Sequence, residues 1–231
     1  MSIRENYHKI RSEVPSHVRI IAAAKTRTPQ EVKELIEAGA TDIGENYVQE
    51  AEDMIQSLDS EMAKKVNWHM IGHLQKNKIN KALPIFDLIQ TVDSLKMAQD
   101  IDKRVEKAGK KSISILLEIN IGSEFSKYGI LPQNHKNFED FMEKLVYDIS
   151  HLSHIKLEGL MTMGPRFEDP KKPRVFFQRT KRIFDRLNKL KLEHVEMKYL
   201  SMGMTNSYKI AIEEGANLIR IGTAIFGKRT Y

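Results

Sequence analysis

The sequence contains no cysteine among its 231 residues, which excludes disulfide bonds and thiolate metal sites. It has no apolar run near the roughly 18 residues that a membrane-spanning helix needs. Its first residues, MSIRENYHKI, lack the apolar core of a secretory signal peptide. No Pro/Ser-rich linker and no shift in composition divides the chain. We therefore expect a cytoplasmic protein with no membrane partner, built as a single domain over residues 1–231.

Charge is plentiful but not concentrated. Lys and Arg number 37 against 31 Asp and Glu, a net charge of +6. Acidic residues are interspersed among the basic ones, a pattern typical of solvated helix surfaces. No basic–aromatic stripe appears, so we do not expect nucleic acid as a partner. The basic stretches are Lys76–Lys81, Lys103–Lys111, Lys171–Arg174 and Arg179–Lys191.

Short apolar runs alternate with helical patterns along the whole chain. Near-continuous apolar strands separated by helices indicate a parallel sheet covered on both faces. The predicted strands are Val18–Lys25, Thr41–Asn46, Asn67–Gly72, Phe86–Ser94, Ser112–Asn120, Lys156–Gly164, Met197–Met204 and Asn217–Gly227. The predicted helices are 29–40, a stretch ending at Ala63, Leu95–Ala108, Asn137–Leu152, Pro173–Leu190 and Asn206–Glu214.

About eight such units in a chain of this length favour a (β/α)8 barrel. A doubly wound open sheet is the structural alternative, but no Gly-rich dinucleotide fingerprint follows the first strand. We predict a polar loop at Glu168–Pro173.

In such a barrel the active site lies at the carboxyl ends of the strands. Lys25 closes the first apolar run, RIIAAAK. Partial burial there would lower the pKa of the amine and suit it to attack a carbonyl group. Lys25 alone, however, is also compatible with a strand-end lysine whose ammonium reaches water.

The last two strand ends change that balance. SMGMT offers Ser201, Gly203 and Thr205, and IRIGT offers Arg220, Gly222 and Thr223. Glycines let a ligand approach the backbone, and a phosphate site formed by the final two loops recurs in this fold. The two motifs together indicate a bound phosphate, although capped strand–turn–helix junctions would show similar residues.

Two histidines, His69 and His73, are spaced by four residues in WHMIGH. That spacing can bind a metal on a helix, but His69 falls in a predicted strand and no third ligand is evident. We expect a hydrogen-bonded histidine pair at the rim instead. The carboxylates Glu45, Asp93 and Glu118 are too dispersed to define an acid–base pair.

The motifs together resemble the pyridoxal phosphate homeostasis proteins over nearly the whole chain. They are AAAKTRT, IGENYVQE, WHMIGHLQKNK, INIGSEFSKYG, LEGLMTMG, LSMGMTNSYKIAIEEG and IRIGTAIFG. The resemblance implies a single barrel of the alanine racemase N-terminal type that holds pyridoxal 5′-phosphate.

In that resemblance Lys25 forms a Schiff base with the cofactor and Arg220 faces its pyridine nitrogen. Thr205, Gly222 and Thr223, with Ser201 and Gly203, hold the phosphate, and Asn46 lies near the ring. The family's usual Met-Ser-x-Asp reads MTNS here, so Ser207 replaces an acidic residue and the role of that acid is in doubt.

We expect a carrier that buffers the cofactor and supplies apo-enzymes that depend on it. The alternative is an amino-acid racemase, which needs a second base that a further domain supplies in alanine racemase. The chain ends at Tyr231, so we expect neither that domain nor clear turnover, and we expect a monomer. A cofactor-free Schiff-base aldolase would leave Arg220 unexplained.

Overall fold

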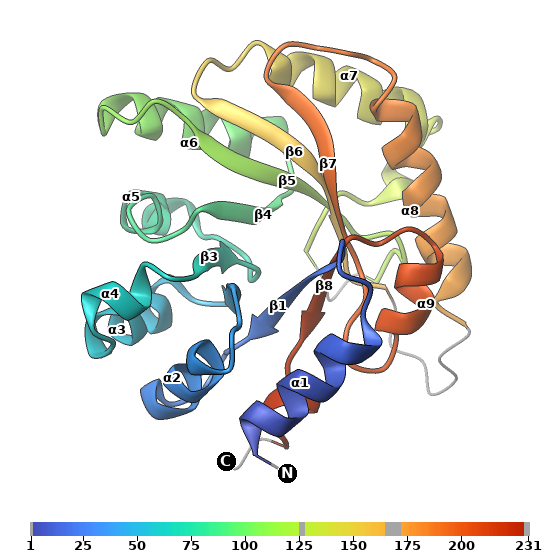
Figure 1. Cartoon of the computed structure of the whole chain (residues 1–231). Helices are drawn as coiled ribbons and strands as arrows, with labels where there is room; N and C mark the ends of the chain where they lie inside the picture. The colour runs from blue at the N-terminus through green and yellow to red at the C-terminus, as the bar shows by residue number, and fades with distance from the viewer. Residues whose placement is uncertain (1, 125–127, 165–171, 229–231) are drawn as a thin grey trace.

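The computed structural model describes residues 2–124, 128–164 and 172–228. Its strands pair in chain order, every pair is parallel, and β8 returns to β1 to close a barrel (Figure 1). Because β1 pairs with both β2 and β8, the sheet has no free edge there. The predicted (β/α)8 barrel is therefore confirmed, and the open sheet is excluded.

The elements alternate as the sequence predicts. The strands are β1 (Arg19–Ala23), β2 (Asp42–Glu45), β3 (Asn67–Met70), β4 (Leu88–Val92), β5 (Ile113–Ile119), β6 (Ile155–Thr162), β7 (Val195–Ser201) and β8 (Leu218–Ile221). The helices are α1 (Ile3–Glu13), α2 (Pro29–Glu37), α3 (Val48–Ser57), α4 (Ser60–Ala63), α5 (Ile79–Ala82), α6 (Leu95–Lys107), α7 (Phe138–Ser150), α8 (Arg174–Leu187), α9 (Tyr208–Glu213) and α10 (Thr223–Phe226), with 3₁₀ helices η1 (Lys76–Lys78) and η2 (Pro132–Asn134).

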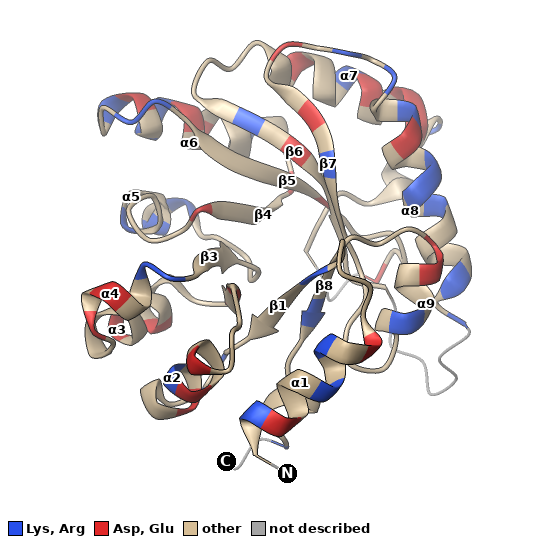
Figure 2. Ribbon diagram, viewed as in Figure 1, with Lys and Arg blue, Asp and Glu red and all other residues tan. Residues whose placement is uncertain are grey.

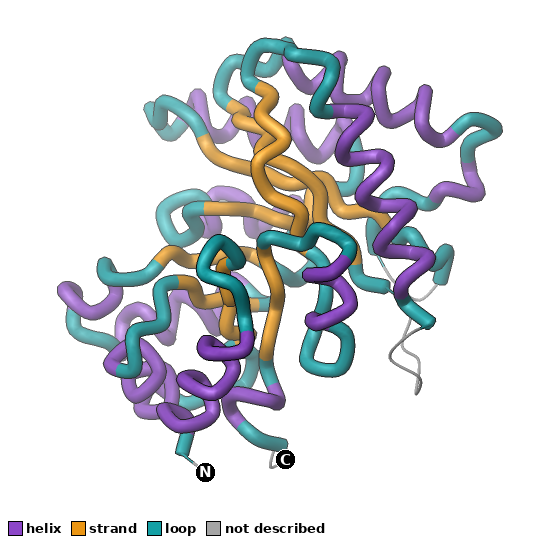
Figure 3. The backbone as a smooth tube through the Cα atoms, turned by 45° about the vertical axis from the view of Figure 1, so that its right-hand side comes forward, coloured by secondary structure: helices purple, strands orange, loops and turns teal. Residues whose placement is uncertain are grey.

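Two layers of apolar side chains hold the barrel together. A small cluster containing Ile21, Leu88, Leu116, Met161 and Leu218 packs separately from the large cluster that joins strands to helices. Because side chains alternate along a strand, residues two positions from these share their face. Helices surround the strands in both views (Figures 1 and 3). Most strands are therefore buried on both faces, which explains their near-continuous hydrophobic runs, whereas β7 exposes Glu196 and Lys198.

An N-terminal helix, α1, precedes the first strand and has no counterpart among the predicted elements. Ser2 accepts from the amide of Glu5, and the Glu5 carboxylate accepts from the amide of Ser2, a capping box. The Asn6 amide donates to the carbonyl of Ile225 at 2.9 Å, so α1 lies against α10 (Figure 1).

Two predicted boundaries were wrong, and another helical segment was not predicted. The last strand stops at Ile221, because the chain turns at Gly222 and enters α10. The helix expected to run to Ala63 breaks at Leu58, and Asp59 caps the separate helix α4 by accepting from Met62. The segment between β3 and β4, for which no helix was predicted, contains η1 and α5. Of the predicted loop, residues 168–171 lie outside the described residues.

Charged residues lie mainly on the helices (Figure 2). On α8, Arg186 pairs with Asp140 at 2.7 Å and with Glu143 at 2.6 Å, and Arg174 pairs with two glutamates of the α9 segment. These pairs agree with solvated helix surfaces for the basic stretches. Within the three described ranges, no helix has the length and apolar character needed to cross a membrane.

Candidate functional site

Lys25 lies immediately after β1, at the mouth of the barrel. The amide of Ala24 donates to the carbonyl of Gly44 at 2.9 Å, and Thr26 adopts a left-handed φ of 62° that turns the chain. The Lys25 side chain is half-buried, and its ammonium lies 5.1 Å from the centroid of the Tyr47 ring. None of the described carboxylates lies within ion-pair distance of it. Lys25 is thus a cation beside an aromatic ring, without an acidic partner in the described chain.

Arg220, on the neighbouring strand β8, points into the barrel and is 4% exposed. Its Nη1 donates to the carbonyl and hydroxyl oxygens of Ser201 at 3.0 and 2.6 Å, and its Nη2 to the carbonyl of Thr162 at 2.8 Å. All three acceptors are neutral, and the described residues supply no ion pair. Burial lowers the pKa of Arg220 to about 10, so its side chain is still a cation at neutral pH.

The segments that follow β7 and β8 bring two hydroxyl groups together. Thr223 Oγ1 donates to Thr205 Oγ1 at 3.2 Å, in an exposed position. Gly203 has a φ of 94°, and a Cβ there would lie 2.6 Å from the Cβ of Ala211, so the fold itself needs this glycine. Gly222 differs, because a Cβ there would meet nothing closer than Ala23 at 3.6 Å. Protein packing therefore does not explain the glycine at 222.

Asn46 lines a pocket of about 370 Å³ on the β2 and β3 side of the mouth. Tyr47, whose ring lies below the Lys25 ammonium, also lines it. Gly72 allows the end of β3 to approach, since a Cβ there would lie 2.3 Å from the Asn46 carbonyl oxygen. The other predicted cofactor residues do not line this pocket. They lie on the β1, β7 and β8 side of the mouth.

Two buried carboxyl groups lie at the ends of β2 and β5. Burial raises the pKa of Glu118 to about 7, and the charge of Arg220 opposes that rise. Glu118 lines the pocket. Burial, with the nearby charge of Glu50, raises the pKa of Glu45 to about 8. Each carboxyl therefore holds a proton more tightly than an exposed one, but they lie on different strands.

The two histidines do not form the pair that their spacing suggested. His69 lies within β3, where its ring nitrogens contact Asp42 at 2.8 Å and Gln90 at 3.1 Å inside the barrel. His73 lies beyond the strand and stacks on Tyr128, with ring centroids 3.7 Å apart. The spacing of four residues joins two positions only on a helix, and this segment is a strand followed by a turn.

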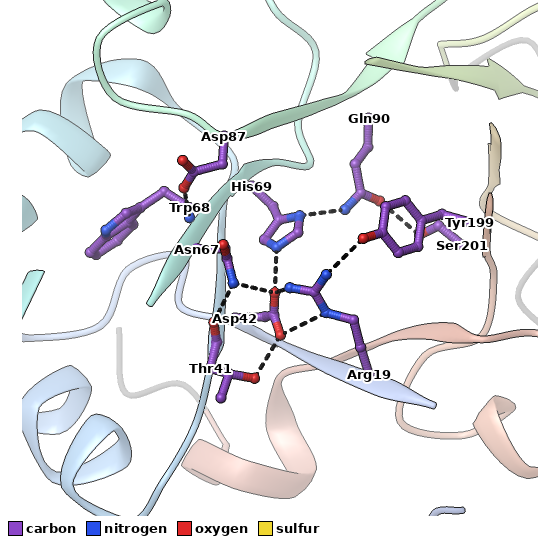
Figure 4. A network of polar contacts seen from close by, with 10 residues as sticks. All are labelled: Arg19, Thr41, Asp42, Asn67, Trp68, His69, Asp87, Gln90, Tyr199 and Ser201. Carbon is purple, nitrogen blue, oxygen red and sulfur yellow. Dashed lines mark hydrogen bonds and ion pairs between the residues drawn. The ribbon is translucent and has the colours of Figure 1, made fainter. Parts of the chain in front are cut away.

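A network of polar side chains crosses the barrel interior (Figure 4). Arg19 binds Asp42 and donates to the Tyr199 hydroxyl, and Asp42 in turn contacts His69. Gln90 joins His69 to Ser201, whose hydroxyl donates to the Gln90 carbonyl at 2.7 Å. Ser201 is therefore fully buried beneath Arg220, with its hydroxyl hydrogen already engaged.

Sequence reasoning did not single out Asp42 and Gln90. Each is a polar residue inside a predicted apolar strand, and both are fully buried. That contrast was the available signal, because a buried polar group needs a partner.

Other polar residues of the predicted rim stabilise local structure. Ser94 caps α6 by accepting from the amide of Met97 at 3.2 Å. The Asn120 side chain donates to the carbonyl of Glu124 at 2.8 Å and accepts from its amide at 3.1 Å. They shape the loops after β4 and β5.

The closed barrel of eight parallel strands is the fold of the alanine racemase N-terminal domain. The sequence profile of the family described as "Alanine racemase, N-terminal domain" matches residues 1–230. An alanine racemase of Clostridium difficile superposes with a TM-score of 0.77 at 15% identity, over all of this chain and 57% of that one. At that identity the likeness shows the fold alone.

Within that class, a nearer group of relatives stands out. The pyridoxal phosphate homeostasis protein of Aquifex aeolicus is 36% identical over 92% of this chain and 88% of its own. PipY of Synechococcus elongatus superposes with a TM-score of 0.88 at 29% identity, over 98% of this chain and 100% of its own. A second PipY structure, with pyridoxal phosphate bound, has a TM-score of 0.84. The chain belongs to the pyridoxal phosphate homeostasis protein family.

Proposed function

We propose that this chain binds pyridoxal 5′-phosphate at the mouth of the barrel and holds it through a covalent bond from Lys25 to the cofactor's aldehyde carbon. One observation carries the proposal. Lys25 follows β1, Arg220 lies on the adjacent strand β8, and neither has a carboxylate within ion-pair distance among the described residues. Unpaired cations at the carboxyl ends of barrel strands suit an anionic ligand. The PipY structure with this cofactor bound supports the choice of ligand.

The residues present fit the cofactor. Pyridoxal phosphate supplies an aldehyde that bonds to an amine and a pyridine ring that withdraws electrons. The Thr205 and Thr223 hydroxyls, 3.2 Å apart, suit the phosphate together with the backbone at Gly203 and Gly222. The absence of a protein contact that would require Gly222 suits a ligand at that place.

Arg220 orients the ring and limits the chemistry. Its pKa of about 10 keeps it protonated at neutral pH, so it donates a hydrogen bond and takes no proton from the ring nitrogen. Asn46 lines the neighbouring pocket, and we place it near the ring. Ser201 supports Arg220 from below. The ring nitrogen then stays unprotonated, and electron withdrawal is weak.

Storage of the cofactor fits these properties better than turnover. The family's curated relatives carry the name of homeostasis proteins and not of an enzyme. We infer that the chain works in the cytoplasm as a monomer, with residues 1–231 as one domain. It buffers a reactive aldehyde and passes the cofactor to apo-enzymes that need it, without nucleic acid as a partner.

Borohydride reduction of the loaded protein tests the attachment. We expect a phosphopyridoxyl group on the peptide containing Lys25. The variant Lys25→Ala should remain folded and unlabelled, while Lys33→Ala, which removes an exposed lysine of α2, should label normally. Labelling that survives in Lys25→Ala, or a chain that stays colourless with pyridoxal phosphate, would contradict the proposal.

A second measurement separates a carrier from a racemase. We expect loaded protein to activate a pyridoxal phosphate-dependent apo-enzyme at least as fast as the same amount of free cofactor. Chiral analysis of amino acids incubated with the loaded chain should show no racemisation at enzymatic rates. Rapid racemisation would replace the carrier by an enzyme.

A further inference from the structure

Five buried residues form a continuous chain of hydrogen bonds from β2 to β8, here called the interior relay. The His69 Nε2–Asp42 Oδ1 distance is 2.8 Å and the Gln90 Nε2–His69 Nδ1 distance 3.1 Å. The Ser201 hydroxyl lies 2.7 Å from the Gln90 carbonyl oxygen, and Arg220 Nη1 lies 2.6 Å from the Ser201 hydroxyl oxygen. Figure 4 shows the first four residues pointing toward one another across the barrel.

The direction of the relay begins at Asp42. Burial alone would raise its pKa, but hydrogen bonds from His69 and Arg19 outweigh burial and lower the pKa below the ordinary value. Asp42 is therefore ionised and can only accept. The His69 nitrogen that faces it, Nε2, must carry a hydrogen. In a neutral imidazole the other nitrogen, Nδ1, then has a free lone pair.

Each later bond follows from this first one. The Nδ1 lone pair of His69 needs a donor, so the NH₂ group of Gln90 faces it and the Gln90 carbonyl faces β7. That carbonyl accepts the hydroxyl hydrogen of Ser201. The oxygen of Ser201 is left with its lone pairs toward Arg220. A donor–acceptor order set by one carboxylate thus extends across the barrel interior.

Arg220 depends on this order because no described carboxylate lies within ion-pair distance of it, and Glu118 acts on it only through its charge. A guanidinium carries five N–H groups. Three of them are engaged by the two Ser201 oxygens and the Thr162 carbonyl. Two N–H groups stay without an acceptor among the described residues. If the Ser201 hydroxyl turned its hydrogen toward Arg220, one of the three bonds would be lost and the guanidinium could rotate.

We propose that Asp42, His69 and Gln90 are positioning residues that act on the cofactor through Ser201 and Arg220, without touching it. They hold the Ser201 oxygen as an acceptor and keep the free N–H groups of Arg220 directed at the ring nitrogen. This inference rests on the proposed function, in which Arg220 faces that nitrogen.

Two substitutions of His69 test the direction of the relay. In His69→Asn, the side-chain oxygen can take the place of Nδ1 and keep an acceptor for Gln90. In His69→Gln, the longer side chain puts its NH₂ group in the place of Nε2 and keeps only the donor to Asp42. We expect His69→Gln to bind pyridoxal phosphate about tenfold more weakly, the loss of about one net hydrogen bond. The absorption maximum of its bound cofactor should also shift. We expect His69→Asn to stay near the unsubstituted protein in both measurements.

The matched pair separates positioning from packing. Both variants shorten a buried ring to a small amide, so a purely structural role would change affinity and spectrum alike in the two. Equal changes would overturn the inference, provided that the unsubstituted chain shows a cofactor band. An unsubstituted chain without any cofactor band would overturn the proposed function itself, and the relay's role with it.

A measurement on the cofactor-free protein does not depend on either variant folding. The nitrogen chemical shifts of His69 at neutral pH should show the hydrogen on Nε2 and a bare Nδ1. A neutral ring with its hydrogen on Nδ1 would reverse the Gln90 amide and refute the relay.

Discussion

Replacing Glu45 by Gln should make the protein more stable in alkali. Glu45 closes β2 and is 1% exposed, and its Oε2 has no hydrogen-bond partner among the described residues. Burial, and then the charge of Glu50, raise its pKa from 4.5 to about 8. Glu45→Gln keeps the shape of the side chain and removes the charge. The comparison therefore isolates the cost of ionising a buried carboxyl group.

The sign of the pH dependence follows from whether the folded or the unfolded chain holds the Glu45 proton. Between pH 4.5 and about 8 the folded chain keeps the Glu45 proton and the unfolded chain releases it. The free energy of unfolding then falls by about 1.4 kcal/mol per pH unit, and the loss is complete above the folded pKa. Over that window the free energy of unfolding falls by at most about 5 kcal/mol. The fall is smaller if the ionised Glu45 side chain turns toward water. Below pH 4.5 the two proteins should be equally stable.

Urea unfolding of the cofactor-free proteins at pH 5, 7 and 9 measures this difference. The stability advantage of Glu45→Gln should grow steadily from the first to the last. Glu106→Gln, at an exposed position of α6, should show no such trend and serves as the matched control. Parallel stability curves for Glu45→Gln and the unsubstituted protein would refute a raised pKa at Glu45.

Four further outcomes follow, three at the site and one at the anchor of α10. Gly222→Ala should keep the melting temperature but weaken loading with pyridoxal phosphate at least tenfold, because its Cβ has room among protein atoms and none beside a bound phosphate. Gly203→Ala should instead unfold at a lower temperature, since its Cβ would lie 2.6 Å from a neighbouring methyl group. Thr205→Val should lower cofactor affinity about tenfold in equilibrium titration through one lost phosphate contact, and unchanged affinity would remove Thr205 from the site. Arg27→Ala should lower the free energy of unfolding in urea by about 1–3 kcal/mol, because Arg27 donates to the Gly227 carbonyl at 2.8 Å and anchors α10. A decrease under about 0.5 kcal/mol would show that α10 stays in place without Arg27.

The fold was predictable because an apolar run recurs in each strand and alternates with amphipathic helical patterns. Leu88–Val92, for example, is buried throughout, although its sequence LIQTV includes two polar residues. Helix α1 escaped prediction since only Tyr7 and Ile10 are buried along it. Its capping box, Ser2 with Glu5, was a local signal that could have revealed it.

The site was only partly predictable, since spacing cannot say which face a residue takes. Lys25 and Arg220 follow from motif and strand position, and the structure places one after β1 and the other on the adjacent strand β8. His69 and His73 were placed together wrongly because one lies in a strand and the other in a turn. Partners such as Gln90, which is distant in sequence from Ser201, appear only when the barrel closes.

The pairing of β8 with β1 also has a consequence for synthesis of the chain. Until Leu218–Ile221 emerge from the ribosome, the β1 ladder that will meet them has no partner. About 200 residues separate the two strands, which at about 5–20 residues per second means roughly 10–40 s of exposed strand edge. Such an edge is a template for association with other chains. Closure therefore waits until β8 has been synthesised, and a chaperone would matter most during that interval.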